Sequence, residues 1–311
     1  MKFGVQLPHF GPLASAEGTF ALARRAEALG FDSVWVGDHV IYPPALAERF
    51  GARLYEAVVT LSWVAATTTR IRLGSAVLIL PYRNPVVLAK QLATLDVLSG
   101  GRLTVGVGVG WLPDEFAALG VPFAERGALT DESLRVIRSL WATERPAFAG
   151  RVFQFPEMLF APRPVQRPHP PIWVGGNTPR AVRRAAELGD GWLPIWHAPT
   201  GRGFTPEALA ERVATLGDLA RKAGRDTPLE TAGLMPFALL DRRPAVEEAR
   251  PLVGPPELVA ETLVRYGEAG LGHVVLSPYY GLPPALTPAS LGDVERLIER
   301  FAGDVRPRLA R

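Results

Sequence analysis

The stretch that decides the fold reads Pro171-Ile-Trp-Val-Gly-Gly-Asn-Thr-Pro-Arg-Ala-Val-Arg-Arg-Ala-Ala-Glu-Leu-Gly-Asp-Gly-Trp-Leu-Pro194. An apolar strand at 172–174 ends in two glycines, and a helix follows from Pro179, which suits the first helical position because it lacks an N–H. Thr178 is a suitable N-cap for this helix. The glycines at 189 and 191 stop the helix before Trp192 opens the next strand. The stretch therefore predicts a βαβ unit.

The turn between this strand and this helix is the first candidate binding site. Backbone N–H groups at a helix N-terminus can bind an anion, and glycine leaves them accessible. A tight turn without any ligand is the alternative, and the local pattern alone does not separate the two interpretations. The candidate phosphate-binding residues are Gly175, Gly176, Asn177 and Thr178.

The same alternation of apolar strands and amphipathic helices runs through the whole chain. Eight strands are expected, at 3–7, 33–36, 72–80, 103–109, 172–174, from 192, at 229–239 and at 273–277. Each is followed by a helix, and no linker separates the pairs. Eight strand–helix pairs in 311 residues predict an α/β fold, a single (β/α)8 TIM barrel domain over 1–311. A doubly wound sheet remains an alternative, because strand counts from sequence are approximate.

Two segments interrupt this rhythm. Residues 143–170 follow the fourth strand and its helix and combine many prolines with four phenylalanines. Because this insertion is too long for an ordinary loop, we expect a hairpin or a lid packed over the barrel. Residues 240–255 form a second excursion, rich in arginine and proline, and are a further candidate for covering the mouth.

Composition excludes several classes of protein. The chain has no cysteine, which excludes disulfides, thiolate metal sites and a cysteine nucleophile. The formal net charge is +3, and arginine and glutamate alternate along helix faces, which argues against nucleic-acid binding. The N-terminus lacks the apolar core of a signal peptide, and no later segment approaches a membrane span. We therefore expect a cytoplasmic protein that binds neither nucleic acid nor a membrane.

Polar residues stand just past several of the predicted strands. Chemistry in such a barrel lies at the carboxyl ends of the strands. His9 follows the first strand, Asp38 and His39 the second, and His197 the sixth. Histidines there can donate protons or hydrogen bonds to a ligand, although each single one also has a structural interpretation. They lack the spacing of metal ligands, so we expect no metal site.

The fourth strand carries glycine at alternate positions. Gly106, Gly108 and Gly110 share one face, against which a flat ligand could lie. The alternative is that these glycines make room for bulky neighbours in the barrel. Beyond them, Glu115 is expected to hold its loop by an ion pair with Arg126.

Together these motifs resemble the luciferase-like flavin/deazaflavin oxidoreductase superfamily. The matching pieces lie in the same order at 30–39, 73–85, 91–102, 106–111, 171–176 and 189–192. They span most of the chain, which makes the resemblance more specific than any single motif. Within the superfamily the chain looks most similar to the branch assigned to coenzyme F420. The resemblance implies a TIM barrel that holds a flavin-like ring in its mouth.

The resemblance also implies roles for individual residues. In this family a non-proline cis peptide backs the ring, and by motif position it falls at Ala76–Val77, directly after Ser75. Asp38 and His39 match the Asp-His pair near the redox edge, where His39 would hydrogen-bond or exchange a proton. The segment 175–178 matches the one that binds the cofactor phosphate.

One departure from the family indicates the substrate class. Trp111 stands where sugar-phosphate dehydrogenases of the superfamily carry an acid, so a phosphorylated sugar is not expected. Together with Trp196 it favours a small apolar substrate. The predicted catalytic residues are thus His39, Asp38 and Trp111. The predicted cofactor-binding residues are His39, Ser75, Ala76, Val77, Gly108, Gly110, Gly175, Gly176, Asn177 and Thr178.

The implied function is F420-dependent hydride transfer to or from this substrate. Val109 stands where FMN enzymes often carry a phosphate-binding arginine, which favours coenzyme F420. An FMN-dependent monooxygenase using reduced flavin and O2 is the first alternative, and a non-catalytic flavin-binding protein the second. A barrel aldolase or isomerase is disfavoured, because no lysine or pair of acids is suitably placed. A homodimer is compatible with the resemblance, since dimers are common in this superfamily.

Overall fold

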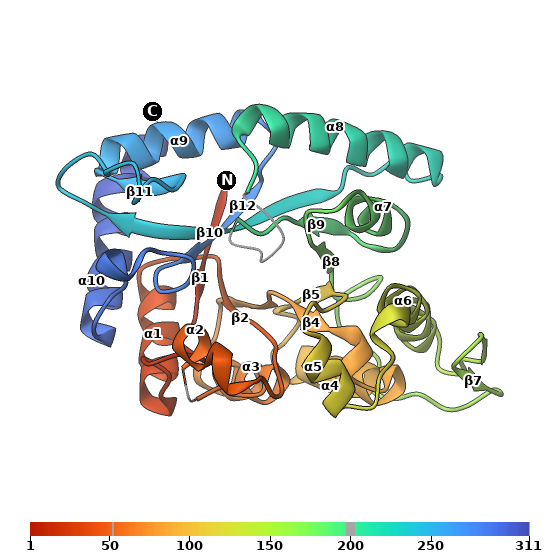
Figure 1. Ribbon diagram of the computed structural model, residues 1–311. Helices are drawn as coiled ribbons and strands as arrows, with labels where there is room; N and C mark the ends of the chain where they lie inside the picture. The colour runs from red at the N-terminus through yellow and green to blue at the C-terminus, as the bar shows by residue number, and fades with distance from the viewer. Residues whose placement is uncertain (52, 197–202, 311) are drawn as a thin grey trace.

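The computed structural model describes residues 1–51, 53–196 and 203–310. Its centre is a ring of parallel strands surrounded by helices (Figure 1). The barrel strands are β1 (Lys2–Gln6), β2 (Ser33–Val36), β3 (Arg72–Ser75), β5 (Leu103–Gly108), β8 (Ile172–Gly175), β9 (Gly191–Leu193), β10 (Glu230–Leu239) and β12 (His273–Ser277). The ring closes because β10 pairs with both β9 and β12, and β12 pairs with β1. The predicted (β/α)8 barrel is confirmed, and the doubly wound alternative, which would have two free edges, is wrong.

Helices cover the outside of this ring. They are α1 (Ala16–Ala28), α3 (Ala57–Thr67), α4 (Pro85–Leu98), α6 (Arg126–Ala142), α7 (Pro179–Leu188), α8 (Pro206–Lys222), α9 (Pro256–Glu268) and α10 (Leu291–Arg300). Shorter elements decorate the ends, namely α2 (Ala47–Phe50), α5 (Pro113–Ala118), β4 (Leu78–Ile79), β11 (Leu252–Gly254) and helical turns at Pro44–Leu46, Leu80–Tyr82, Phe123–Glu125, Pro284–Leu286, Phe301–Val305 and Arg306–Ala310.

Local sequence chemistry sets where the helices begin. The Thr178 side chain accepts a hydrogen bond from the Ala181 N–H at the start of α7, and Pro179 occupies the first turn. Asn84 caps α4 in the same way, again before a proline. Such side-chain caps satisfy backbone N–H groups that have no partner within the helix, each stabilising it by about 1 kcal/mol.

Aromatic side chains fill the interior of the barrel away from the carboxyl ends of its strands. The indoles of Trp35 and Trp173 stack with centroids 5.3 Å apart, and the His273 ring packs edge-on against both. Glycines on neighbouring strands make this possible: a Cβ at Gly74 would lie 2.3 Å from Trp35, and one at Gly191 would lie 2.6 Å from Trp173. The barrel is therefore a packed core at this level.

Polar residues bind the amino-terminal end of the barrel together. Buried Asp96 accepts hydrogen bonds from the backbone N–H groups of Val165 (2.8 Å) and Gln166 (3.0 Å). The Arg102 guanidinium donates to carbonyl oxygens at the end of α3 and before β3. These contacts stabilise the fold at the end opposite the strands' carboxyl termini.

The insertion at 143–170 contains an antiparallel hairpin, β6 (Phe148–Ala149) and β7 (Gln154–Phe155). Glu132 of α6 accepts the backbone N–H groups of Val152 and Phe153, both at 2.8 Å, and holds the hairpin at the side of the molecule, where Figure 1 shows β7 at the margin beyond α6. Residues 240–255 add β11 in parallel beside β10. Among the described residues, neither segment lines the cavity at the barrel mouth, so both differ from the covering positions that the sequence suggested.

Candidate active site

A cavity of about 420 Å³ opens at the carboxyl ends of the barrel strands. Every barrel strand, or the segment after it, contributes at least one lining residue, from Gln6 at the end of β1 to Tyr280 after β12. All predicted site residues line this cavity except Ser75, whose buried hydroxyl donates to the Gly106 carbonyl oxygen at 2.8 Å. Barrel enzymes hold their ligands in this position.

The peptide bond between Ala76 and Val77 is cis and separates β3 from β4. The Val77 side chain occupies space that two glycines leave open: a Cβ at Gly108 would lie 2.5 Å from a Val77 methyl, and one at Gly175 would lie 2.6 Å from the other. At Gly106 a Cβ would lie 1.8 Å from the Ser75 carbonyl oxygen. Gly106 and Gly108 therefore make room for neighbouring residues of the barrel, which is the alternative that the sequence offered to a face for a flat ligand.

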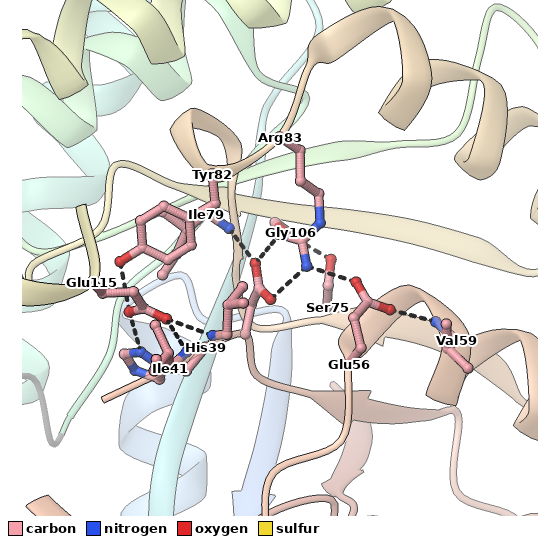
Figure 2. A network of polar contacts seen from close by, with 12 residues as sticks. His39, Ile41, Glu56, Val59, Ser75, Ile79, Tyr82, Arg83, Gly106 and Glu115 are labelled. Carbon is pink, nitrogen blue, oxygen red and sulfur yellow. Dashed lines mark hydrogen bonds and ion pairs between the residues drawn. The ribbon is translucent and has the colours of Figure 1, made fainter. Parts of the chain in front are cut away.

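Asp38 is completely enclosed by donors. Its Oδ2 accepts the Ile79 N–H at 2.9 Å and Arg83 at 2.5 Å, and its Oδ1 accepts Arg83 at 2.8 Å. The carboxylate has no solvent exposure. The same guanidinium also donates to Glu56 at 2.6 Å, as Figure 2 shows, and so links the loops after β2 and β3. Asp38, which was predicted as catalytic, lines the cavity with its carboxylate held by Arg83 and the Ile79 N–H, so it fixes the cavity wall.

The two ring nitrogens of His39 differ in their surroundings. Its Nδ1 lies 2.7 Å from Oε2 of Glu115, whose side chain is fully buried. Its Nε2 has no partner among the described residues, and the residue lines the cavity. Glu115 also accepts the Tyr82 hydroxyl at 2.7 Å (Figure 2). The expected ion pair between Glu115 and Arg126 is wrong, because Glu115 is already surrounded by other donors.

Burial and hydrogen bonds set the protonation states of Glu115 and Tyr82. Burial opposes ionisation of Glu115, yet hydrogen bonds from His39, the Val40 N–H and Tyr82 hold the pKa of Glu115 below its ordinary value. Burial, followed by the hydrogen bond to Glu115, raises the pKa of Tyr82 far above its ordinary value. Tyr82 is therefore the donor and Glu115 an ionised acceptor.

The other predicted histidines do not share this geometry. His9 is buried, its Nδ1 lies 2.9 Å from the Leu7 carbonyl oxygen, and its Nε2 accepts the Gly37 N–H at 2.7 Å. Burial lowers the pKa of His9 to about 4, so the ring is neutral and structural. His197 lies outside the described residues.

One end of the cavity can accept an anion. The Gly176 N–H donates to the Leu193 carbonyl oxygen at 3.2 Å, so the expected donor at this glycine is already used. Within the described chain, the N–H groups of Asn177 and Thr178 have no partner. Arg126 and Arg184 line the same end, and the Arg126 Nε is buried without a partner among the described residues.

The Asn177 side chain has a different task from its backbone. Its Nδ2 donates to the Ile195 carbonyl oxygen at 2.7 Å, and its Oδ1 accepts the Ile195 N–H at 2.9 Å. These two bonds fix the segment after β9 to the turn after β8. Asn177 therefore shapes the cavity with its amide and offers a ligand only its backbone.

The other end of the cavity is aromatic. The Phe10 ring packs edge-on against Tyr280 at 5.3 Å and Phe50 at 6.0 Å, and His39 lies 5.0 Å from Phe50 and 5.7 Å from Trp111. We call these four residues, Phe10, Phe50, Trp111 and Tyr280, the aromatic wall. Predicted Trp111 thus lies beside His39. Trp196 is buried and does not line the cavity.

Some residues of this site were missed from the sequence. Arg83 appeared there only as part of a matched segment, and Tyr82 and Glu115 were not connected with His39. The motif Pro81-Tyr-Arg-Asn-Pro85 after a predicted strand could have indicated Arg83 as a site residue. Asp38, the partner of Arg83, lies 45 positions earlier in the chain, so only closure of the barrel brings the two together.

The chain matches the luciferase-like monooxygenase family over residues 1–280. It belongs to this family. A similar, uncharacterized protein of Mycobacterium tuberculosis is 32% identical over 295 residues, covering 91% of this chain and 93% of the relative. Another protein of that organism, provisionally named a coenzyme F420-dependent oxidoreductase, is 35% identical over 240 residues, covering 73% of this chain and 64% of its own.

A solved structure has the same fold over its whole length. The crystal structure of a monooxygenase from Streptomyces bottropensis superposes with a TM-score of 0.80 at 28% identity and covers 99% of both chains. As a member of the luciferase-like monooxygenase family, the chain is an oxidoreductase. No helix in the described ranges is long and apolar enough to cross a membrane. In the same ranges, no three histidine or acidic side chains form a metal-binding group.

Proposed function

We propose that this protein is a coenzyme F420-dependent oxidoreductase that transfers a hydride to or from a small, uncharged, apolar substrate. The observation that carries the proposal is the division of one cavity into an anion-accepting end and the aromatic wall, with His39 beside the wall. The relative named for coenzyme F420 supports the choice of cofactor, as does Val109, which lines the cavity where FMN enzymes often carry an arginine.

The residues at the anion-accepting end fit the phosphate of such a cofactor. The Arg126 Nε is a buried donor without an acceptor among the described residues, which is costly unless a ligand supplies the acceptor. Asn177 and Thr178, whose N–H groups have no partner in the described chain, line the same cavity. The amino terminus of α7 adds its positive dipole end. Val77 and the cis peptide before it would form the surface behind the ring.

The cofactor, when bound, supplies or accepts the hydride. The aromatic wall binds an apolar substrate and excludes water from the reacting atoms. His39 is placed to give or take up a proton at Nε2 as a substrate carbonyl is reduced to an alcohol or an alcohol is oxidised to a carbonyl. Asp38 and Arg83 neutralise each other, so no unpaired charge from that pair faces the substrate.

An FMN-dependent monooxygenase is the second candidate function. The specific observation that favours it is the 28% identity, over 99% of the chain, to a structure named as a monooxygenase. Both cofactors carry a phosphate and a tricyclic ring, so the same residues would hold either. A flavin-binding protein without turnover is the remaining alternative.

A titration followed by an assay separates these functions. We expect reduced F420 to bind and to be oxidised by a panel of neutral ketones and aldehydes equally well with and without air. Product formation only with reduced FMN and only in air would replace the proposal by the monooxygenase. Binding of either ring without turnover of any compound in the panel would favour the passive carrier.

A further inference from the structure

Glu115 accepts hydrogen bonds at both of its oxygens. Oε1 accepts the backbone N–H groups of Val40 at 2.5 Å and Ile41 at 3.2 Å. Oε2 accepts the Tyr82 hydroxyl and faces Nδ1 of His39, each at 2.7 Å. The side chain is fully buried and belongs to α5, whereas three of its four partners belong to the loop after β2. The carboxylate therefore fixes the His39 loop to the loop after β5.

This arrangement decides which nitrogen of His39 carries the proton. An ionised carboxylate can only accept, so Nδ1 must be the protonated nitrogen of the neutral ring. The other nitrogen, Nε2, then presents a lone pair. Which tautomer a histidine adopts is set by the hydrogen bond that its other nitrogen makes.

We propose that Glu115 is a positioning residue that holds His39 in the Nδ1–H tautomer, so that Nε2 accepts the proton of a substrate hydroxyl. In the reverse direction the protonated ring, facing the carboxylate, returns that proton from Nε2 to the substrate oxygen. The substrate O–H bond breaks as the Nε2–H bond forms, and the C–H bond of the carbon that bears this oxygen breaks as its hydride passes to the cofactor, leaving a C=O bond. The proton and hydride transfers rest on the proposed function, whereas the tautomer of His39 does not.

Replacing the carboxylate by an amide tests the assignment sharply. In Glu115→Gln the amide oxygen must remain at Oε1, because two backbone N–H groups point at it. The NH2 group then takes the place of Oε2 and donates to Nδ1 of His39. The ring can accept this bond only if its proton moves to Nε2. The variant keeps the volume of the side chain and inverts the tautomer.

Tyr82→Phe is the matched control. It removes one donor to the same Oε2 but leaves the carboxylate, and the Tyr82 ring keeps its edge-on contact with Phe116 at 4.9 Å. The Nδ1–H tautomer is therefore retained. His39→Gln identifies the His39 signals among the five histidines of the chain.

The experiment is 1H–15N NMR of the histidine rings in the cofactor-free protein, in mildly alkaline buffer. We expect the proton on Nδ1 in the wild type and in Tyr82→Phe, and on Nε2 in Glu115→Gln. A wild-type ring protonated at Nε2 overturns the proposal even if Glu115→Gln does not fold. An unchanged tautomer in a folded Glu115→Gln overturns it as well.

Turnover provides the second readout. With F420 bound, Glu115→Gln is expected to lower kcat by about 10²- to 10⁴-fold with the cofactor Kd unchanged, the range for losing a positioned proton-transfer group. An unchanged kcat in a variant with an inverted tautomer contradicts the role of Nε2. If the wild type binds neither ring, the proposed function fails while the tautomer result still stands.

Discussion

Two carboxylate networks follow the end of β2, one centred on Asp38 and the other on Glu115. Figure 2 shows Arg83 of the first network and the contacts of Glu115 with His39 and Tyr82 in the second. Both carboxylates are buried and both bind backbone N–H groups. The Asp38 network is closed, because its charge is neutralised by Arg83 and every partner belongs to the protein. The Glu115 network ends at His39, whose Nε2 has no partner in the described parts of the chain. A closed network of this kind fixes the shape of the cavity, whereas an open one can bind a ligand.

His39→Gln is expected to have the largest effect on the reaction. Removing the nitrogen that exchanges the proton should lower kcat by about 10²- to 10⁴-fold, while the cofactor Kd and the melting temperature stay unchanged. Steady-state kinetics and a binding titration measure the two quantities separately. His169→Gln, a histidine outside the cavity lining, is the control. Equal losses in kcat and affinity would mean that His39 is only part of the cavity wall.

Arg83→Met tests the closed network. It leaves the Asp38 carboxylate buried without its partner, which we expect to lower the free energy of unfolding by about 3–5 kcal/mol. Urea unfolding measures this loss, and the double variant with Asp38→Asn should recover part of it. Arg145→Met, which breaks an exposed ion pair with Glu157, should cost less than about 1 kcal/mol. Similar losses in both variants would contradict the distinction.

Acid is expected to destabilise the fold because two buried histidines, His9 and His273, resist protonation in the folded protein. Burial lowers the pKa of His9 from 6.5 to about 4 and that of His273 to about 3. Above pH 6.5 both are neutral in the folded and unfolded states. As the pH falls below 6.5 the unfolded chain takes up protons first, so stability is lost down to the folded pKa, about 3 kcal/mol for His9 alone.

Urea unfolding at a series of pH values checks this slope. We expect the free energy of unfolding to fall steadily from pH 6.5 downward, before most carboxylates titrate near about pH 4. A constant value over that interval would show that the two rings are protonated as easily in the folded protein as in the unfolded chain.

Gly108→Ala is expected to have the smallest of these effects. Its Cβ would lie 2.5 Å from a Val77 methyl, and such overpacking costs about 1–3 kcal/mol. The shift of Val77 should also weaken cofactor binding in a titration. Gly303→Ala, whose Cβ would meet nothing within 4 Å, is the control. Unchanged stability and affinity in Gly108→Ala would mean that Val77 is free to move aside.

The sequence alone predicted the barrel because its strands and helices are local features. The strand before Gly175, the N-cap at Thr178 and the order of the eight strands each follow from neighbouring residues, and each agrees with the structure. The position of the cavity followed from the fold class. For the same reason His39 could be identified as a candidate from its place after β2.

The partners of the site residues could not be predicted in this way. Glu115 lies 76 positions from His39, and closure of the barrel brings them together. The expected pair with Arg126 failed because that guanidinium lies 3.8 Å over the Phe123 ring. The proline- and phenylalanine-rich insertion has no regular period, so its composition did not indicate which face it covers. Its backbone bonds to Glu132 place it beside α6.

The most direct test of the account is a crystal structure of the protein with F420. We expect the tricyclic ring in the cavity beside Val77 and His39, with the phosphate of its tail within hydrogen-bond distance of the Asn177 and Thr178 N–H groups. F420 bound elsewhere on the surface, with the cavity closed by the protein's own side chains, would contradict the assignment of the barrel mouth as the cofactor site.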